Sequence, residues 1–127
     1  MAEIEQMPQI EVPIEHYFAQ GIYGRLGRLK KGTNFAGRVH LQSQINIIQS
    51  GDVTLLDEHG LTRLQGPCIW VSQAGAQRAA YVNEDTVWIT LLGTHETDPA
   101  VIFEKCTRRT QGEAAKAFDE AANIIQE

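Results

Sequence analysis

The chain has 127 residues, of which 43% are hydrophobic and 21% charged, and it carries a net charge of −5. This length fits one globular domain, and the acidic balance argues against nucleic-acid binding, which needs a basic face. No apolar run reaches the roughly 20 residues that span a bilayer, so we expect no membrane partner. Eleven glycines and four prolines favour a turn-rich β fold over a helical bundle.

The N-terminal segment, residues 1–12, is predicted to be an acidic arm outside the folded domain. It lacks the basic start and the apolar stretch of a signal peptide, so we expect a protein that is not secreted by that route. Cys68 and Cys106 have no metal-ligand spacing, and we expect both to be reduced thiols.

Residues 13–95 contain short strand-like segments between turn signals, a spacing typical of a β-sandwich or barrel. The predicted strands are 22–29, 37–41, 44–48, 53–56, 61–64, 68–71, 77–82 and 86–92. The strand at 44–48 is expected to end in a break of the strand at Ser50-Gly51-Asp52, and a tight polar turn is expected at residues 83–85. Residues 53–64 are predicted to form a hairpin around Gly60, and residues 68–71, apolar on both faces, to form a central strand.

In residues 96–127 the apolar residues recur with the period of a helix. Asp98-Pro99 is predicted to begin a helix, and Thr110-Gln111-Gly112-Glu113 fits a capping box for a second one. Beyond it lies an apolar stripe, formed by Ala114, Ala117, Phe118, Ala121 and Ile125. Two interpretations stay open: the stripe packs on the domain's own sheet, or it docks on a neighbouring subunit.

One spacing carries more information than the rest: Gly32, Arg38, His40, Gln44 and Gly51. It resembles the first cupin motif, in which a glycine precedes two histidines one residue apart, a glutamate and a second glycine. The segment 73–78 occupies the place of the second cupin motif. The resemblance spans about residues 21–92 and implies an all-β, cupin-like jelly-roll barrel with a short C-terminal helical tail.

The sequence is also similar to that of small cupin-like proteins of tailed bacteriophages, over residues 16–25, 32–33, 37–40, 73–78 and 85–88. This resemblance implies a phage origin and a location in the host cytoplasm or the virion. Members of that group tend to have a lysine after the histidine and a second histidine four residues further on. This chain has Leu41 and Gln44 at those positions.

The metal-ligand positions of the cupin pattern hold Arg38, His40, Gln44 and Arg78. Arginine has no lone pair to donate at neutral pH, and an amide oxygen is a weak transition-metal ligand. Only His40 is left as a donor, so we predict neither a metal site nor a cofactor.

Strand parity points a polar set into the mouth of the barrel: Arg38, His40, Gln44, Asn46 and Arg78. Two guanidinium groups could hold a carboxylate or phosphate through paired hydrogen bonds, which predicts a site for a small anionic or sugar-like ligand. The alternative is a hydrogen-bonded polar cluster that fills the place of a former metal site. No catalytic constellation is legible.

Three functional hypotheses follow. The first is a non-enzymatic phage-type protein that assembles as a homo-oligomer or with other phage proteins. It would be a structural or accessory component, with the virion as one place where it could act. The second is a cupin that binds a small anionic ligand through Arg38 and Arg78. The third is a metal-free isomerase or epimerase with His40 as base, which would need a second acid–base group; Tyr81 is expected to face away from Arg78.

Overall fold

The computed structural model describes residues 13–36, 39–57 and 60–108. Its elements are β1 (Ile14–Ala19), β2 (Ile22–Leu29), β3 (Asn34–Ala36), β4 (Val39–His40), β5 (Gln44–Asp57), β6 (Gly60–Gln65), β7 (Cys68–Ser72), β8 (Ala79–Gly93), α2 (Pro99–Cys106) and β9 (Thr107–Arg108). The predicted N-terminal arm and the apolar stripe of residues 114–125 lie outside the described residues.

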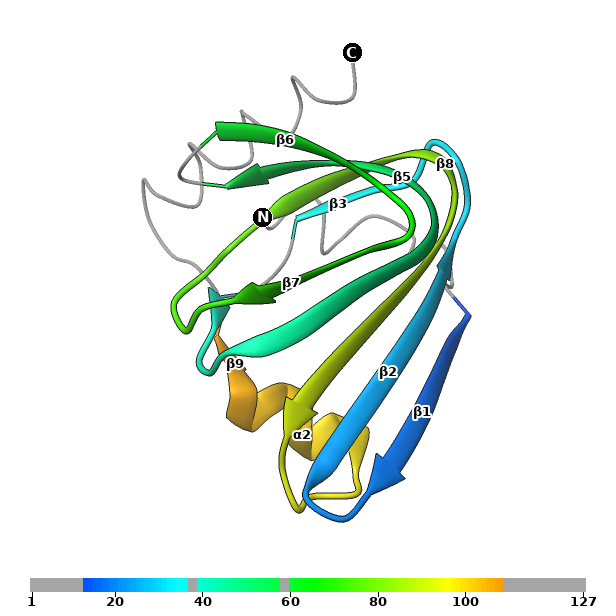
Figure 1. The fold of residues 1–127 in the computed structure, drawn as a ribbon. Coiled ribbons are helices and arrows are strands. Elements are labelled where there is room, and N and C mark those ends of the chain that lie inside the picture. Colours follow the sequence, from blue (N-terminus) through cyan, green and yellow to red (C-terminus); the bar gives the residue numbers. More distant parts are fainter. Residues whose placement is uncertain (1–12, 37–38, 58–59, 109–127) are drawn as a thin grey trace.

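Two long strands, β5 and β8, organise the main sheet, and the other strands pair with them (Figure 1). Every pair is antiparallel. The strand order is β1-β2-β8-β5-β6, with β7 paired to β5 and β3 paired to β8, while β4 and β9 form a separate two-stranded sheet. The prediction of an all-β fold with a short C-terminal helix is confirmed.

Both long strands were expected to be interrupted, and both are continuous. The break predicted at Ser50-Gly51-Asp52 is instead a bend in β5, where the register against β8 shifts between Ile48 and Val53. Gly51 has a φ of 115°, so the chain turns there without leaving the sheet. The turn predicted at residues 83–85 is also wrong, because β8 runs through them opposite Asp52.

Because residues 68–71 are apolar on both faces, a central strand was predicted there, and this prediction is wrong for β7. Among the described strands it pairs with β5 alone, and its side chains divide between two environments. Trp70 packs against the core, whereas Ile69 is 67% and Val71 56% exposed. The apolar residues on its second face therefore lie on the surface.

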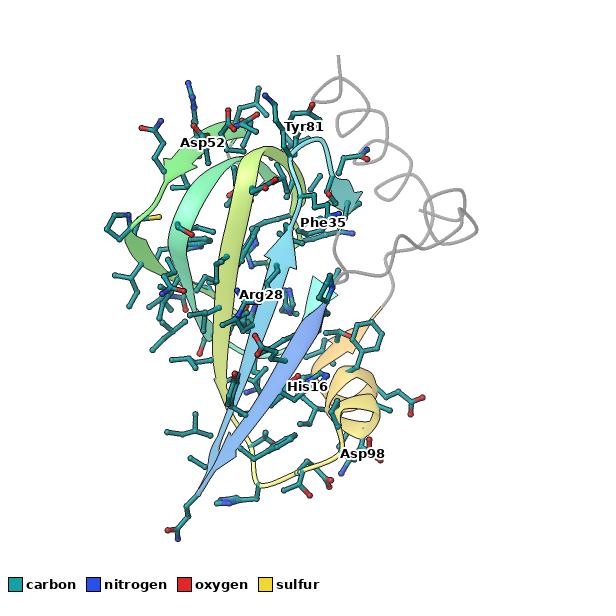
Figure 2. The ribbon with its side chains drawn as sticks, turned by 90° about the vertical axis from the view of Figure 1, so that its right-hand side faces the viewer. His16, Arg28, Phe35, Asp52, Tyr81 and Asp98 are labelled. Carbon is teal, nitrogen blue, oxygen red and sulfur yellow. The ribbon has the colours of Figure 1, made fainter. Side chains whose placement is uncertain are left out.

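The core lies on the concave side of the bent sheet, which we call the inner face. Its fully packed centre consists of Ile48, Val53, Leu55 and Ala80, surrounded by the half-buried side chains of Phe35, Leu64, Cys68, Trp70 and Trp88. Asp52 and Asp98 lie at opposite ends of the described structure (Figure 2).

The helix α2 begins where the sequence predicts. The Asp98 side chain accepts a hydrogen bond from the Ala100 amide at 3.0 Å, with Pro99 in the first turn. Ile102 anchors the helix with 3% exposure, and the chain then enters β9, so residues 96–127 contain a strand as well as a helix. In the described ranges, no helix has the length and apolar character needed to cross a membrane.

Candidate functional site

Two amides on β5 begin the site. Gln44 and Asn46 are two residues apart on one strand, so both point to the inner face, where they are 6% and 1% exposed. A buried amide needs hydrogen-bond partners, because its desolvation otherwise costs about 1–3 kcal/mol. The partners of Asn46 are therefore the next question.

The Asn46 carboxamide makes hydrogen bonds to both neighbouring strands. Its Nδ2 donates to Ser72 Oγ on β7 at 2.6 Å, while its Oδ1 accepts from Trp88 Nε1 at 3.1 Å and from Thr90 Oγ1 at 3.3 Å on β8. Asn46 therefore joins three strands and fixes the Trp88 ring. This part of the predicted set matches the alternative of a hydrogen-bonded polar cluster.

Arg78 lies over the tryptophan pair that this network positions. Its Cζ is 5.8 Å from the Trp70 ring centroid and 6.0 Å from that of Trp88, and the two rings are tilted by 56° to each other. Among the described residues no carboxylate forms an ion pair with Arg78. Burial lowers the pKa of Arg78, and the charge of Asp57 partly offsets this. An arginine side chain remains protonated at neutral pH.

His40 is held rigidly by its backbone. Its N–H donates to the Ala76 carbonyl at 3.0 Å, its carbonyl accepts from the Gly75 amide at 2.7 Å, and it pairs with Thr107 of β9. The ring Nε2 lies 3.5 Å from the Gln44 Nε2. The turn of residues 73–76 and the C-terminal strand therefore fix the imidazole beside Gln44.

The imidazole of His40 is neutral at physiological pH. Burial, and after it the positive charges of Arg78 and Arg25, together lower its pKa to about 4. Two guanidinium groups, from β2 and from the segment before β8, thus act on one ring. The inner face collects positive charge although the whole chain is acidic.

Arg25 is the functional residue that sequence reasoning missed. It pairs with Thr90, which pairs with Asn46, so all three share the inner face. The alternation of residues 22–29 was a sufficient signal for its direction, but not for its nearness to His40, which lies 15 positions away. Arg38, the other predicted arginine, lies outside the described residues.

A second pair missed by the sequence lies beside Arg25. The His16 Nδ1 and the Tyr23 hydroxyl are 2.6 Å apart, and the Phe18 ring stacks on Tyr23 with centroids 5.1 Å apart. Burial raises the pKa of Tyr23, and the charge of Arg25 partly opposes this. These side chains extend the polar inner face onto β1 (Figure 2).

The described donors do not fit a transition metal. They contain no group of three or more histidine, cysteine, aspartate or glutamate side chains. His40 is one imidazole facing two cations, and the Asn46 oxygen already accepts two hydrogen bonds. The chemistry that this arrangement offers is hydrogen bonding and positive charge.

Replacing Arg78 with glutamine is expected to raise the pKa of His40 from about 4, because one of the two repelling charges is removed. The value should stay below 6.5, since burial is the larger cause. Histidine NMR titration measures it. Arg28→Gln is the matched control, because Arg28 lies on the opposite face of β2 from Arg25; an equal shift in both variants would contradict the geometry.

Comparison with known proteins finds the fold but no family. No protein-family model matches the chain, and no curated protein matches its sequence. The similar solved structures include KdgF from Halomonas sp. (15% identity, TM-score 0.61, 73% of this chain and 88% of that chain), a cupin-2 domain protein from Shewanella frigidimarina (10%, 0.56, 73% and 90%) and a salicylate 1,2-dioxygenase variant from Pseudoaminobacter salicylatoxidans (14%, 0.56, 61% and 25%). At these identities the likeness shows a cupin-like fold alone.

Proposed function

We propose that this cupin-fold protein binds a small anionic ligand on its inner face, with Arg78 and Arg25 as the recognition residues. The observation that carries the proposal is the Arg78 guanidinium, which lies over two tryptophan rings and has no ion pair among the described residues. A partly buried cation is costly without a partner, and an anion would supply one.

The position of Arg78 over the two tryptophan rings favours this use. A guanidinium is attracted to aromatic faces through its charge, and its N–H donors can still meet carboxylate or phosphate oxygens. Because the Trp88 indole donates to Asn46, one of the two rings beneath Arg78 is held in place before any ligand arrives. Less ordering entropy is then lost on binding.

Neutral His40 adds a second kind of contact. An imidazole with a pKa of about 4 can donate one hydrogen bond and accept another, which suits a hydroxylated anion such as a sugar phosphate or a sugar acid. Arg25 provides the second charge from β2. Together these groups define a ligand with one or two negative oxygens and neighbouring hydroxyl groups.

A thermal-shift panel of sugar phosphates, nucleotides and hydroxy acids tests the proposal. A ligand at 100 times its Kd stabilises the folded state by about 2.7 kcal/mol, which raises the Tm by several degrees in a domain of this size. Arg78→Gln and Arg25→Gln are each expected to weaken binding about 10- to 100-fold. Arg28→Gln, on the outer face, should keep the shift. A panel without a stabilising anion, or an unchanged shift in Arg78→Gln, contradicts the proposal.

The other two hypotheses have different support. An assembling role, with or without a phage origin, draws on the exposed apolar side chains of β7, Ile69 and Val71. An isomerase would need an acid–base pair near His40, and Tyr81 pairs with Thr54 on the strand face opposite Ala80 of the core. The binding hypothesis therefore accounts for more of the inner-face residues than either of the other two hypotheses.

A further inference from the structure

The two buried amides of β5 are satisfied to different degrees. The Asn46 carboxamide makes three hydrogen bonds, all to side chains of the neighbouring strands. The Gln44 carboxamide is 6% exposed and makes one long contact, in which its Nε2 lies 3.5 Å from the His40 Nε2. In the described part of the chain, no hydrogen bond reaches the Gln44 Oε1. A buried amide oxygen without a donor is costly, so this open position needs an explanation.

The contact with His40 does not remove the open position. An amide NH₂ group only donates, so the Nε2 of the neutral His40 ring accepts in this contact and the ring hydrogen is on Nδ1. If the amide is turned over, the ring donates to Oε1 instead, and the NH₂ group becomes the open one. In either orientation one polar atom of the buried Gln44 amide has no partner among the described residues.

A second open hydrogen-bonding group lies beside Gln44. Ser72 of β7 is the cross-strand partner of Gln44 and is 5% exposed. Directly opposite residues have Cβ atoms about 4.5–5.5 Å apart, so the two side chains lie together on the inner face. The Ser72 Oγ accepts from the Asn46 Nδ2, and within the described ranges its own hydroxyl hydrogen has no acceptor. Gln44 and Ser72 therefore offer one free acceptor and one free donor side by side.

A hydroxyl group fits this pair of residues, because a hydroxyl both donates and accepts. It can donate to the Gln44 Oε1 and accept from the Ser72 hydroxyl, whereas a carboxylate or phosphate oxygen only accepts. The anionic group of the same ligand has its place at Arg78. The charge of Arg78 acts on the His40 ring, and that ring contacts Gln44, so the two positions are neighbours on the inner face.

We propose that Gln44 and Ser72 bind a hydroxyl group of the ligand, so that the inner face selects hydroxylated anions, such as sugar acids, over plain carboxylates and phosphates. This inference rests on the anion-binding function proposed above and assigns its specificity to Gln44. A site whose buried groups bind a hydroxyl rejects an analogue that lacks it, because those groups are then left unpaired.

Unfolding of the free protein tests whether Gln44 serves a ligand or the fold. Gln44→Met removes the half-satisfied amide and keeps the unbranched shape of the side chain, so the urea midpoint is expected to stay the same or to rise. Asn46→Leu is the matched control, because it leaves the Trp88 indole without its acceptor, and its midpoint should fall clearly. A midpoint that falls as far in Gln44→Met as in Asn46→Leu overturns the inference.

Isothermal titration calorimetry with matched pairs of anions tests the selectivity itself. The pairs are glycerate and propionate, gluconate and hexanoate, and glycerol 3-phosphate and propyl phosphate. The wild type is expected to bind the hydroxylated member of at least one pair about 10- to 100-fold more tightly. Gln44→Met should lose this preference and still bind the plain anion, whereas Arg78→Gln should weaken the binding of both members.

The inference and the proposed function fail in different ways. If anions bind and the wild type does not prefer the hydroxylated member of any pair, the inference is overturned and the anion-binding function stands. The same holds if Gln44→Met keeps the preference. If no anion binds to the wild type, both are overturned.

Discussion

Replacing Gly51 with alanine is expected to destabilise the domain by about 3–5 kcal/mol. Gly51 has a φ of 115°, and a Cβ added there would lie 2.6 Å from Thr86 Cα and 2.7 Å from the Asp85 carbonyl oxygen. Both are backbone atoms of β8, so relief requires the two long strands to separate. A loss of this size is a large part of the 5–15 kcal/mol that holds a domain of this kind together.

Gly60 provides a control with the same backbone strain. Its φ is 113°, and a Cβ added there meets nothing within 4 Å. Gly60→Ala should therefore cost only the strain, about 1–2 kcal/mol. Urea unfolding followed by fluorescence of the core residues Trp70 and Trp88 measures both variants. Equal losses would mean that the crowding against β8 has no effect.

The same glycine shows why the strand boundaries were mispredicted. Locally, Ser50-Gly51-Asp52 has the composition of a turn, and residues 83–85 do as well. The two segments lie against each other, with Asp52 paired to Glu84, so each is held extended by a partner more than 30 residues away. Local propensity does not contain that information. The helix start at Asp98, which depends on neighbouring residues alone, was predicted correctly.

In the candidate site too, features within one strand could be predicted from the sequence, and contacts between strands could not. Alternation along one strand was enough to predict that Gln44 and Asn46 point inward, and the structure buries both. Alternation could not show that Asn46 is consumed by Trp88, Thr90 and Ser72, because each lies on another strand. No motif in the sequence marked Trp70 or Trp88 as part of the site. Their contact with Arg78 depends on how β7 and β8 approach each other.

The cupin resemblance could predict the fold but not the activity. It predicted the fold, which the solved structures support, but those neighbours differ in activity, from KdgF to a dioxygenase. One fold hosts many functions, so activity must be argued from the site. A phage origin and a virion role stay predictions for this chain.

Asp52→Asn is expected to lower the free energy of unfolding by about 2 kcal/mol. The Asp52 carboxylate is 5% exposed and accepts from Arg63 Nη2 at 2.6 Å, Gln65 Nε2 at 3.0 Å and Asn83 Nδ2 at 2.9 Å. An asparagine would turn an NH₂ group towards these donors, so at least one hydrogen bond is lost and one donor faces another. Glu15→Gln, which breaks an exposed ion pair, should cost less than about 1 kcal/mol.

The pH dependence of this loss identifies its cause. Hydrogen bonds from Arg63 and then Asn83 hold the pKa of the Asp52 carboxyl well below its usual range. A carboxyl with a lowered folded-state pKa stabilises fully above its unfolded pKa of about 3.9, and this stabilisation disappears as the pH falls towards the folded value. Wild type and Asp52→Asn should therefore differ most above about pH 5, and in urea unfolding the difference should shrink steadily as the pH is lowered from 5 towards 2. A difference that stays constant over that range would mean that the ionised carboxylate is not the stabilising form.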